Sequence, residues 1–268
     1  MSRTASPSPT SSTPTSSAPL LAARGLVKFY GKTQVLHDVS IDVAPGEAHV
    51  VIGPNGAGKT TLFKAVSGEF PVDGGEIRFD EGDVTRLAGW QRVRRGVGRS
   101  FQVARIFGEM TTAENLTVAV ESRERRTRGG FSLTFRISPR RSTLAEVSRL
   151  LDGLGLGPRA DDPAKLLSHG DKKRLELAMS LALRPKLIML DEPTAGMSPG
   201  DRTAAAELIA ETQRRHGFAF LLTEHDMGVV FGLAQRLTVL HHGRVIASGE
   251  PAAVRDDPTV KEVYLGHG

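Results

Sequence analysis

The sequence of 268 residues contains no cysteine, only one tryptophan and only two tyrosines. The absence of cysteine excludes disulfide bonds and thiolate metal sites. No apolar run approaches the roughly 20 residues of a membrane-spanning helix, so we expect that the chain does not cross a bilayer by itself. The net charge of +5 is small; it suits an anionic ligand or a lipid surface, and we expect no nucleic-acid partner.

The first 19 residues differ in composition from the rest. Residues 2–19 are Ser, Thr, Pro and Ala, with Arg3 as the one charged side chain. They lack the apolar stretch of a secretory signal peptide. Because they also offer too little apolar surface to offset the entropy of ordering, we expect a disordered tail at 1–19 and a folded domain at 20–268.

The strongest motif is a glycine-rich loop of nine residues: Gly53, Pro54, Asn55, Gly56, Ala57, Gly58, Lys59, Thr60 and Thr61. It follows a β-type run (48–52) and leads into a helical segment (60–67), which is the context of a P-loop. Its backbone N–H groups and the helix N-terminus favour phosphate. We expect Lys59 to reach the β- and γ-phosphates, Thr60 to bind Mg²⁺ and Thr61 to support the α-phosphate of a nucleoside triphosphate. A glycine-rich turn that matches by chance is the alternative.

A pair of carboxylates, Asp191-Glu192, follows the apolar run 187–190. Ligands of open α/β sheets bind at the carboxyl ends of the strands, where this pair would lie. Asp191 could hold Mg²⁺ through water, and Glu192 could polarise the water that attacks the γ-phosphate. The alternative is an acidic turn after a core strand.

The remaining pattern predicts an α/β fold. Short runs with turn residues between them predict antiparallel strands over 20–80, and 39–43 alternates with period two. Helical patterns predominate from about 90 to 165, which predicts an inserted helical subdomain. Helices alternate with apolar strands after residue 162, which predicts parallel crossovers in a P-loop core sheet. The arginine-rich stretch 121–141 is interpreted as a solvated insertion, with contact to lipid head groups as the alternative.

The order of the motifs is more specific than any one of them. The chain runs from the glycine-rich loop through Gln102, the segment Leu167-Ser168-His169-Gly170-Asp171 and Asp191-Glu192 to His225. This order resembles the ATP-binding subunit of an ABC transporter, from Tyr30 to the C-terminus. The resemblance implies ATP and Mg²⁺ as ligands. It also implies a dimer in which each ATP lies between one subunit's P-loop and the other's 167–171 segment.

The resemblance implies a role for each of five further residues. Tyr30 would stack on adenine, Gln102 would sense Mg²⁺ and the attacking water, and His225 would contact the γ-phosphate. Ser168 and Gly170 would bind the γ-phosphate of the partner subunit. Taken singly, Tyr30 could instead pack on the core, and Gln102 or His225 could be an ordinary polar loop residue.

Two segments depart from the common pattern of this family. The segment 167–171 has His169 and Asp171 where Gly and Gln are usual, and Ser198 stands where the usual loop has Asp. A narrower resemblance to ATPases of branched-chain amino acid importers, or of urea and amide importers, comes from three stretches and the 121–141 insertion. The stretches are 99–116, 223–227 and 263–266.

The resemblance implies ATP hydrolysis that drives uptake of a small polar solute at the cytoplasmic face of the cell membrane. The expected partners are a second ATPase subunit, transmembrane permease subunits and, indirectly, a periplasmic or extracellular solute-binding protein. An ABC exporter ATPase, a soluble ABC ATPase outside transport and a nucleotide-binding module without catalysis are the alternatives. The complete set of Lys59, Asp191 and Glu192 argues against the last.

Overall fold

Two sheets of different kinds form the protein. The computed structural model describes residues 18–99, 106–127, 139–197 and 199–265. The antiparallel sheet has the order β2-β1-β4-β5 and consists of β1 (Leu21–Tyr30), β2 (Thr33–Val43), β4 (Gly74–Phe79) and β5 (Gly82–Asp83). The second sheet has the order β10-β9-β3-β8-β7-β6. Its strands are β3 (Ala48–Ile52), β6 (Val97–Arg99), β7 (Leu187–Asp191), β8 (Ala219–Thr223), β9 (Arg236–His241) and β10 (Arg244–Gly249).

All neighbours in the second sheet are parallel except β10, which pairs with β9 as an antiparallel edge. The predicted α/β fold, with a parallel core sheet and a separate antiparallel portion, is therefore confirmed. Parallel strands are covered on both faces, which explains why the predicted strand 187–190 and residues 219–222 of β8 are continuous apolar runs.

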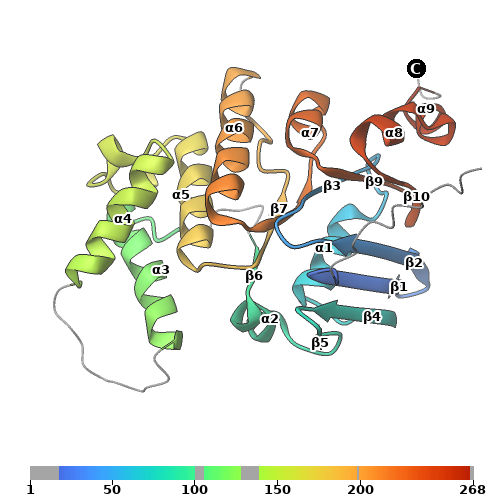
Figure 1. Ribbon diagram of the computed structural model, residues 1–268, viewed down its shortest axis with the longest axis horizontal. Helices are drawn as coiled ribbons and strands as arrows, with labels where there is room; N and C mark the ends of the chain where they lie inside the picture. Colours follow the sequence, from blue (N-terminus) through green and yellow to red (C-terminus); the bar gives the residue numbers. More distant parts are fainter. Residues whose placement is uncertain (1–17, 100–105, 128–138, 198, 266–268) are drawn as a thin grey trace, which may run out of the picture.

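The helices lie on both sides of this sheet. They are α1 (Lys59–Ser67), α2 (Gly89–Arg95), α3 (Thr112–Thr127), α4 (Arg141–Gly153), α5 (His169–Ala182), α6 (Pro199–His216), α7 (Met227–Leu233), α8 (Pro251–Asp256) and α9 (Pro258–Leu265). Figure 1 shows α3, α4 and α5 together at one end of the molecule and the antiparallel sheet at the other. Among the described helices, none is both long and apolar enough to cross a bilayer.

The core sheet separates two hydrophobic clusters. Val51 on β3 and Leu221 on β8 belong to the cluster that α1 shares with the antiparallel sheet. Val50 and Leu222, which point to the other face, belong to the cluster that includes side chains of α3, α4, α5 and α7. Because successive side chains of a strand alternate between faces, each apolar strand stabilises both clusters.

The range 90–165, expected to form an inserted helical subdomain, contains α3 and α4. It also contains β6, which pairs with β7 through Val97 and Leu187 and so belongs to the core sheet. Helix α5, which begins after residue 165, shares the hydrophobic cluster of α3 and α4. The division into subdomains remains a prediction.

The interpretation of 121–141 as a solvated insertion is wrong for its first part. Residues up to Thr127 continue α3, and the Arg123 side chain is only 11% exposed. Its guanidinium donates two hydrogen bonds of 2.7 Å to the carboxylate of Glu146 on α4 and one of 2.6 Å to the Ala182 carbonyl at the end of α5. Arg123 therefore joins three helices, and bidentate pairing explains its tolerance of burial.

A fully buried histidine lies on β3, the strand that leads into the glycine-rich loop. His49 Nδ1 donates to the Asp42 carbonyl at 2.8 Å, and Nε2 accepts from the Thr238 hydroxyl at 2.8 Å. This arrangement fits the neutral ring, with the proton on Nδ1. Burial lowers the pKa of His49 from 6.5 to about 4. The positive charge of Arg236 contributes to this downward shift.

His49 should make the protein sensitive to acid. Between pH 6.5 and about 4 the unfolded chain binds a proton at this ring and the folded chain does not. The free energy of unfolding should therefore fall by about 3 kcal/mol as the pH drops through this window. Denaturant unfolding at a series of pH values checks this. A His49→Gln variant, which cannot titrate there, should show a smaller loss over the same window, and an equal loss would contradict the assignment.

Candidate functional site

The predicted phosphate-binding and carboxylate residues meet at one edge of the core sheet. Val51 of β3 pairs with Thr223 of β8, and Thr223 pairs with Asp191 of β7. These strands are parallel, so their carboxyl ends lie side by side at this edge. Gly53 and Glu192 begin the loops that leave it. The register therefore brings together two motifs that lie about 140 residues apart in the sequence, as expected for a ligand site of an open α/β sheet.

The glycine-rich loop lies directly against the backbone of β9. A Cβ added to Gly53 (φ 156°) would lie 2.1 Å from the Leu240 carbonyl oxygen. A Cβ on Gly58 (φ 102°) would lie 3.2 Å from the Val35 carbonyl oxygen of β2. The turn after β9 closes the contact, because the Gly243 N–H donates to the Ala57 carbonyl at 2.9 Å. The glycines are needed for this close approach as well as for backbone conformation.

Helix α1 begins at Lys59, directly behind the loop, and no side chain caps its N-terminus. The Lys59 ammonium is buried and donates to the carbonyls of Gly53 (2.6 Å) and Pro54 (3.1 Å). Burial lowers its pKa, and the charges of Glu192 and Asp191 oppose this shift. Lys59 thus folds over the loop and faces both carboxylates, where an added phosphate would meet its charge.

Asp191, the last residue of β7, is buried and accepts a 2.7 Å hydrogen bond from the Thr223 hydroxyl at its Oδ1. Thr60, at the start of α1, is half-buried. A hydroxyl and a carboxylate are hard oxygen donors of the kind that Mg²⁺ takes from a protein when phosphates complete its coordination. The side chains present therefore fit Mg²⁺.

Glu192 is held in an unusual backbone conformation, with φ at 50°. Its N–H donates to the carbonyl oxygen (3.2 Å) and the hydroxyl oxygen (3.1 Å) of Thr223. Its carboxylate accepts a 2.7 Å hydrogen bond from His225 Nε2. Two side chains named from sequence thus contact each other, and both are partly exposed. A non-glycine residue at positive φ costs on the order of 1–3 kcal/mol and occurs often at functional sites.

Glu224, which is only 3% exposed, has a structural role that was not predicted from the sequence. Its carboxylate accepts from the Thr194 N–H (3.0 Å), the Thr194 hydroxyl (2.6 Å) and the His225 N–H (3.0 Å). It therefore joins the loop after β7 to the loop after β8. Its place in the sequence could have indicated this role, because Glu224 follows an apolar strand and directly precedes the predicted site residue His225.

Ser168 and Gly170 lie at the start of α5, away from the row of strand ends. The Ser168 hydroxyl caps this helix by accepting from the Asp171 N–H at 3.1 Å, and it donates to the Asp171 carboxylate at 2.8 Å. Asp171 also pairs with Arg174 at 3.1 Å. The exposed helix start suits an anion, and Arg174 offsets the charge that Asp171 brings there.

Tyr30, at the end of β1, is 50% exposed, and its ring meets that of Phe70 edge to face with centroids 5.9 Å apart. It is accessible for stacking, and its contact with adenine remains a prediction. Gln102 and Ser198 lie outside the described residues.

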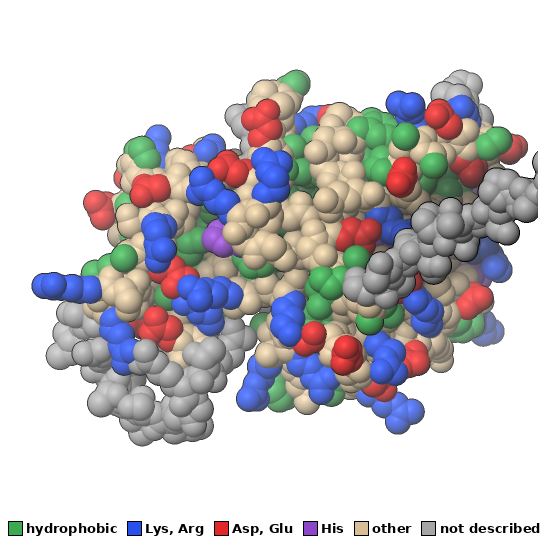
Figure 2. Space-filling model, in the orientation of Figure 1, with side chains coloured by type: hydrophobic (Ala, Val, Ile, Leu, Met, Phe, Trp, Pro, Cys, Tyr) green, Lys and Arg blue, Asp and Glu red, His purple; other side chains and the backbone are tan. Residues whose placement is uncertain are grey.

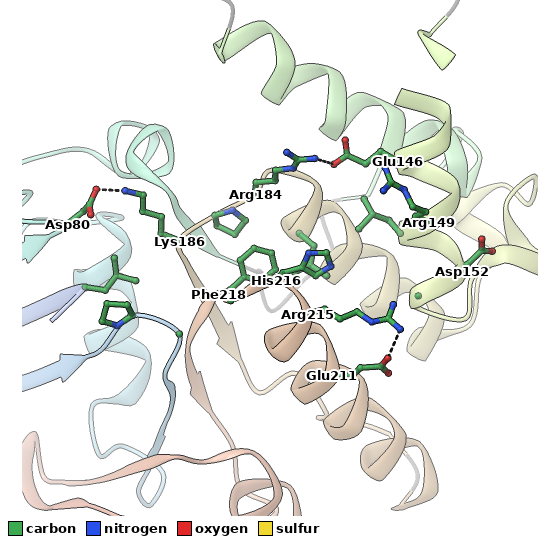
Figure 3. A pocket seen from close by; sticks show the side chains of 18 residues that line it. Asp80, Glu146, Arg149, Asp152, Arg184, Lys186, Glu211, Arg215, His216 and Phe218 are labelled. Carbon is green, nitrogen blue, oxygen red and sulfur yellow. Dashed lines mark hydrogen bonds and ion pairs between the residues drawn. The ribbon is translucent and has the colours of Figure 1, made fainter. Parts of the chain in front are cut away.

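A cavity of about 1190 Å³ lies at the opposite edge of the core sheet. Its lining includes Pro45, Pro185 and Gly217, which precede β3, β7 and β8. A five-residue strand spans about 16 Å, so this cavity is separate from the glycine-rich loop. Six of its charged side chains form ion pairs with each other (Figure 3), namely Arg184–Glu146, Lys186–Asp80 and Arg215–Glu211.

Two family models match the chain. The model of ABC transporters matches residues 36–195, which contain the glycine-rich loop, the start of α5 and both carboxylates. The model described as "Branched-chain amino acid ATP-binding cassette transporter" matches residues 244–268.

Curated relatives align over nearly their whole length. The high-affinity branched-chain amino acid transport ATP-binding protein LivG of Salmonella typhimurium is 39% identical over 93% of this chain and 99% of its own. BraF of Pseudomonas aeruginosa, with the same description, is 36% identical over 93% and 99%. The lipopolysaccharide export system ATP-binding protein LptB of Acidithiobacillus ferridurans is 37% identical over 92% and 97%.

Solved structures of ATP-binding cassettes superpose on nearly the whole chain. A nucleotide-free ATP-binding cassette from an ABC transporter superposes with a TM-score of 0.78 at 30% identity, over 92% of this chain and 99% of that one. An ATP-binding cassette in its ADP conformation gives 0.79 at 29% identity, over 93% and 100%.

The contact between Gly53 and β9 can be tested by substitution. Gly53→Ala must displace the Leu240 carbonyl, whereas Gly56→Ala meets no atom within 4 Å and carries only the strain of its positive φ. Gly56→Ala should cost about 1 kcal/mol, and Gly53→Ala at least about 2 kcal/mol more. Thermal unfolding and ATP titration measure both effects. Equal losses for the two variants would show that β9 does not constrain the loop.

Proposed function

This chain belongs to the ABC transporter family as an ATP-binding, ATP-hydrolysing subunit, and from this premise we propose that it drives uptake of a small polar solute through partner membrane subunits. The observation that carries the proposal is the match of residues 244–268 to the branched-chain amino acid cassette model, together with the descriptions of LivG and BraF. The proposed solute is a branched-chain amino acid, and urea or a short amide is the alternative solute.

The proposed chemistry begins with Lys59 and the backbone N–H groups of residues 53–61, which bind the phosphates of ATP. Thr60 and Asp191 would hold Mg²⁺, and the resemblance adds Gln102. When bound, this ion supplies positive charge at the phosphates. Glu192 accepts the proton of the attacking water, as a general base near the γ-phosphate. His225, 2.7 Å from that carboxylate, orients it and contacts the γ-phosphate.

The proposed site is complete only in a dimer. Tyr30 supports the adenine from the same chain. Ser168 and Gly170 lie at an exposed helix start, and the buried side chains of that helix belong to the opposite face of the core sheet from those of α1, the helix behind their own glycine-rich loop. A second copy, or a related ATPase subunit, would bring its own 168–170 segment to the phosphates across the interface.

Export is the second candidate function, because LptB is about as similar to this chain as LivG and BraF are. The 244–268 match favours import. Isolation of the native complex and identification of the proteins that copurify with it would distinguish the two.

The proposed contact with permease subunits lies beside the segment 106–110. Gly108 and Met110 accept backbone hydrogen bonds from Lys165 (3.0 Å) and Ala164 (2.9 Å). On these two joined segments Phe107 is 51%, Met110 36% and Leu166 73% exposed. We name these three side chains the apolar docking patch. A permease helix that covers it would hold the chain peripherally at the cytoplasmic face, and a solute-binding protein would act indirectly from the other side.

Ile106, which precedes Phe107, is not part of the docking patch, because its side chain packs against the larger hydrophobic cluster. The Asn115 side chain fixes the backbone of Phe107 through its N–H (2.8 Å) and its carbonyl (3.0 Å).

On the face in Figure 2, basic and acidic side chains are intermixed, which gives no reason to propose nucleic acid as a partner.

Glu192 and Lys59 should separate catalysis from binding. Glu192→Gln keeps size and polarity but loses the basic carboxylate, so kcat should fall at least about 100-fold with ATP affinity retained. Lys59→Ala removes the cation at the phosphates and should weaken ATP binding at least about tenfold. Steady-state ATPase assays and ATP titrations measure the two effects. Equal loss of ATP binding in both variants would refute this division of roles.

The docking patch should matter for assembly and not for hydrolysis. Phe107→Ser should leave the ATPase rate of the isolated subunit within about twofold but reduce copurification with permease subunits at least about tenfold. Leu144→Ser, on α4 and equally exposed at 50%, is the matched control and should assemble normally. Normal assembly and transport by Phe107→Ser would sink the docking proposal.

A further inference from the structure

The loop that follows β7 is held through its carbonyl oxygens by one lysine. Lys173 lies in the second turn of α5, and its ammonium donates to the carbonyls of Glu192 (3.2 Å), Pro193 (3.2 Å) and Ala195 (2.9 Å). We call residues 192–197 the catalytic loop. An ammonium has three N–H donors, and the catalytic loop supplies an acceptor for each.

This lysine completes the restraint on Glu192. The N–H of Glu192 donates to Thr223 on one side of the α-carbon, and its carbonyl accepts from Lys173 on the other. Both peptide groups of the residue are therefore fixed, at a φ of 50° that a glutamate rarely adopts. The direction in which the carboxylate leaves the backbone depends on both contacts.

Lys173 also joins this restraint to the start of α5. The helix begins at His169, directly after Ser168, and a helix moves as a rigid unit over two turns. The His169 ring lies against the same loop, because a Cβ on Gly196 would lie 3.8 Å from its Nε2. Displacement of the Ser168–Gly170 segment would therefore pull on the catalytic loop.

Burial lowers the pKa of Lys173, and the carboxylates of Glu224, Glu176 and Glu192 oppose this shift in part. The neighbouring Lys172 is different. It is half-buried like Lys173, but its ammonium donates to the Lys165 carbonyl, outside the catalytic loop.

We propose that Lys173 is a positioning residue for ATP hydrolysis: it holds Glu192 in the orientation that the reaction needs and makes that orientation depend on the position of the Ser168–Gly170 segment. The inference rests on the proposed role of Glu192 as general base. It gives this chain a link within one subunit between the segment that serves the neighbour's ATP and the base that serves its own.

Kinetics of three variants test the proposal. Lys173→Met keeps the length of the side chain but loses all three donors, so kcat should fall at least about tenfold while KM for ATP changes less than about twofold. Lys173→Arg keeps the charge and the donors and should recover at least about a third of the wild-type kcat. Lys172→Met is the matched control and should keep both parameters. A wild-type kcat in Lys173→Met, or an equal loss in Lys172→Met, would overturn the proposal.

A second measurement follows the loop itself. Because the chain has no cysteine, Ala195→Cys, at an exposed position, provides a single site for a nitroxide label. Without nucleotide, Lys173→Met should increase the mobility of the label and Lys172→Met should not. Unchanged mobility in Lys173→Met would contradict the restraint. If Lys173→Met does not fold, the shorter Lys173→Gln takes its place in both measurements, with the same outcomes.

Measurements in the Glu192→Gln background separate the proposed role of Lys173 from the proposed role of Glu192 as general base. If Lys173 acts through Glu192, adding Lys173→Met to Glu192→Gln should lower the residual single-turnover rate by less than about twofold. A further tenfold loss there would show that Lys173 acts by another route. If Glu192→Gln alone hydrolyses ATP normally, the assignment of the base fails. If Glu192→Gln is inactive and Lys173→Met hydrolyses ATP at the wild-type rate, only the positioning role of Lys173 fails.

Discussion

The glycine-rich loop can take its shape only because a distant part of the backbone passes directly behind it. The Leu240 carbonyl occupies the space where a side chain on Gly53 would lie. The turn that follows donates from the Gly243 N–H to Ala57, and the Gly243 carbonyl accepts from the His37 N–H of β2 at 2.8 Å. The loop is thus fixed by backbone atoms that belong to both sheets and to the turn after β9.

The same edge of the sheet carries a second set of restraints on the carboxylates. Thr223, at the end of β8, contacts both Asp191 and Glu192. Arg202, on α6, donates to the Met197 carbonyl (3.0 Å) and to Asp226 (2.9 Å), the residue that caps α7. The loops after β7 and β8 are therefore joined to each other and to two helices. Such support from neighbouring groups is what keeps a catalytic side chain in a defined place.

Much of this arrangement could be predicted from the sequence, for reasons that are local. The apolar runs 187–190 of β7 and 219–222 of β8 are continuous because both faces of a parallel sheet are buried. The glycines before Lys59 and the carboxylates after residue 190 carry their chemistry in consecutive residues. Glu192 and His225, which were named separately from the sequence, form a direct hydrogen bond in the structure.

The parts that could not be predicted depend on which distant atoms become neighbours. Arg92 was an ordinary charged residue in the sequence, yet its side chain is 1% exposed. Its guanidinium donates to the carbonyls of Ala65 and Val66 at the end of α1, a contact that no local pattern signals. Glu224 and Lys173 were missed for a related reason, because each contacts backbone groups of the loop after β7, which is distant in sequence. Backbone acceptors are present at every position, so sequence alone does not say which ones a buried charge will find.

The most direct test of the central claim, a hydrolytic site completed by a second subunit, is ATP turnover per chain measured against chain concentration, with molar mass measured by light scattering in the same samples. The account predicts that turnover per chain rises with concentration to a plateau as the mass rises from one chain to two. Turnover that stays constant while the mass remains that of a single chain would contradict it.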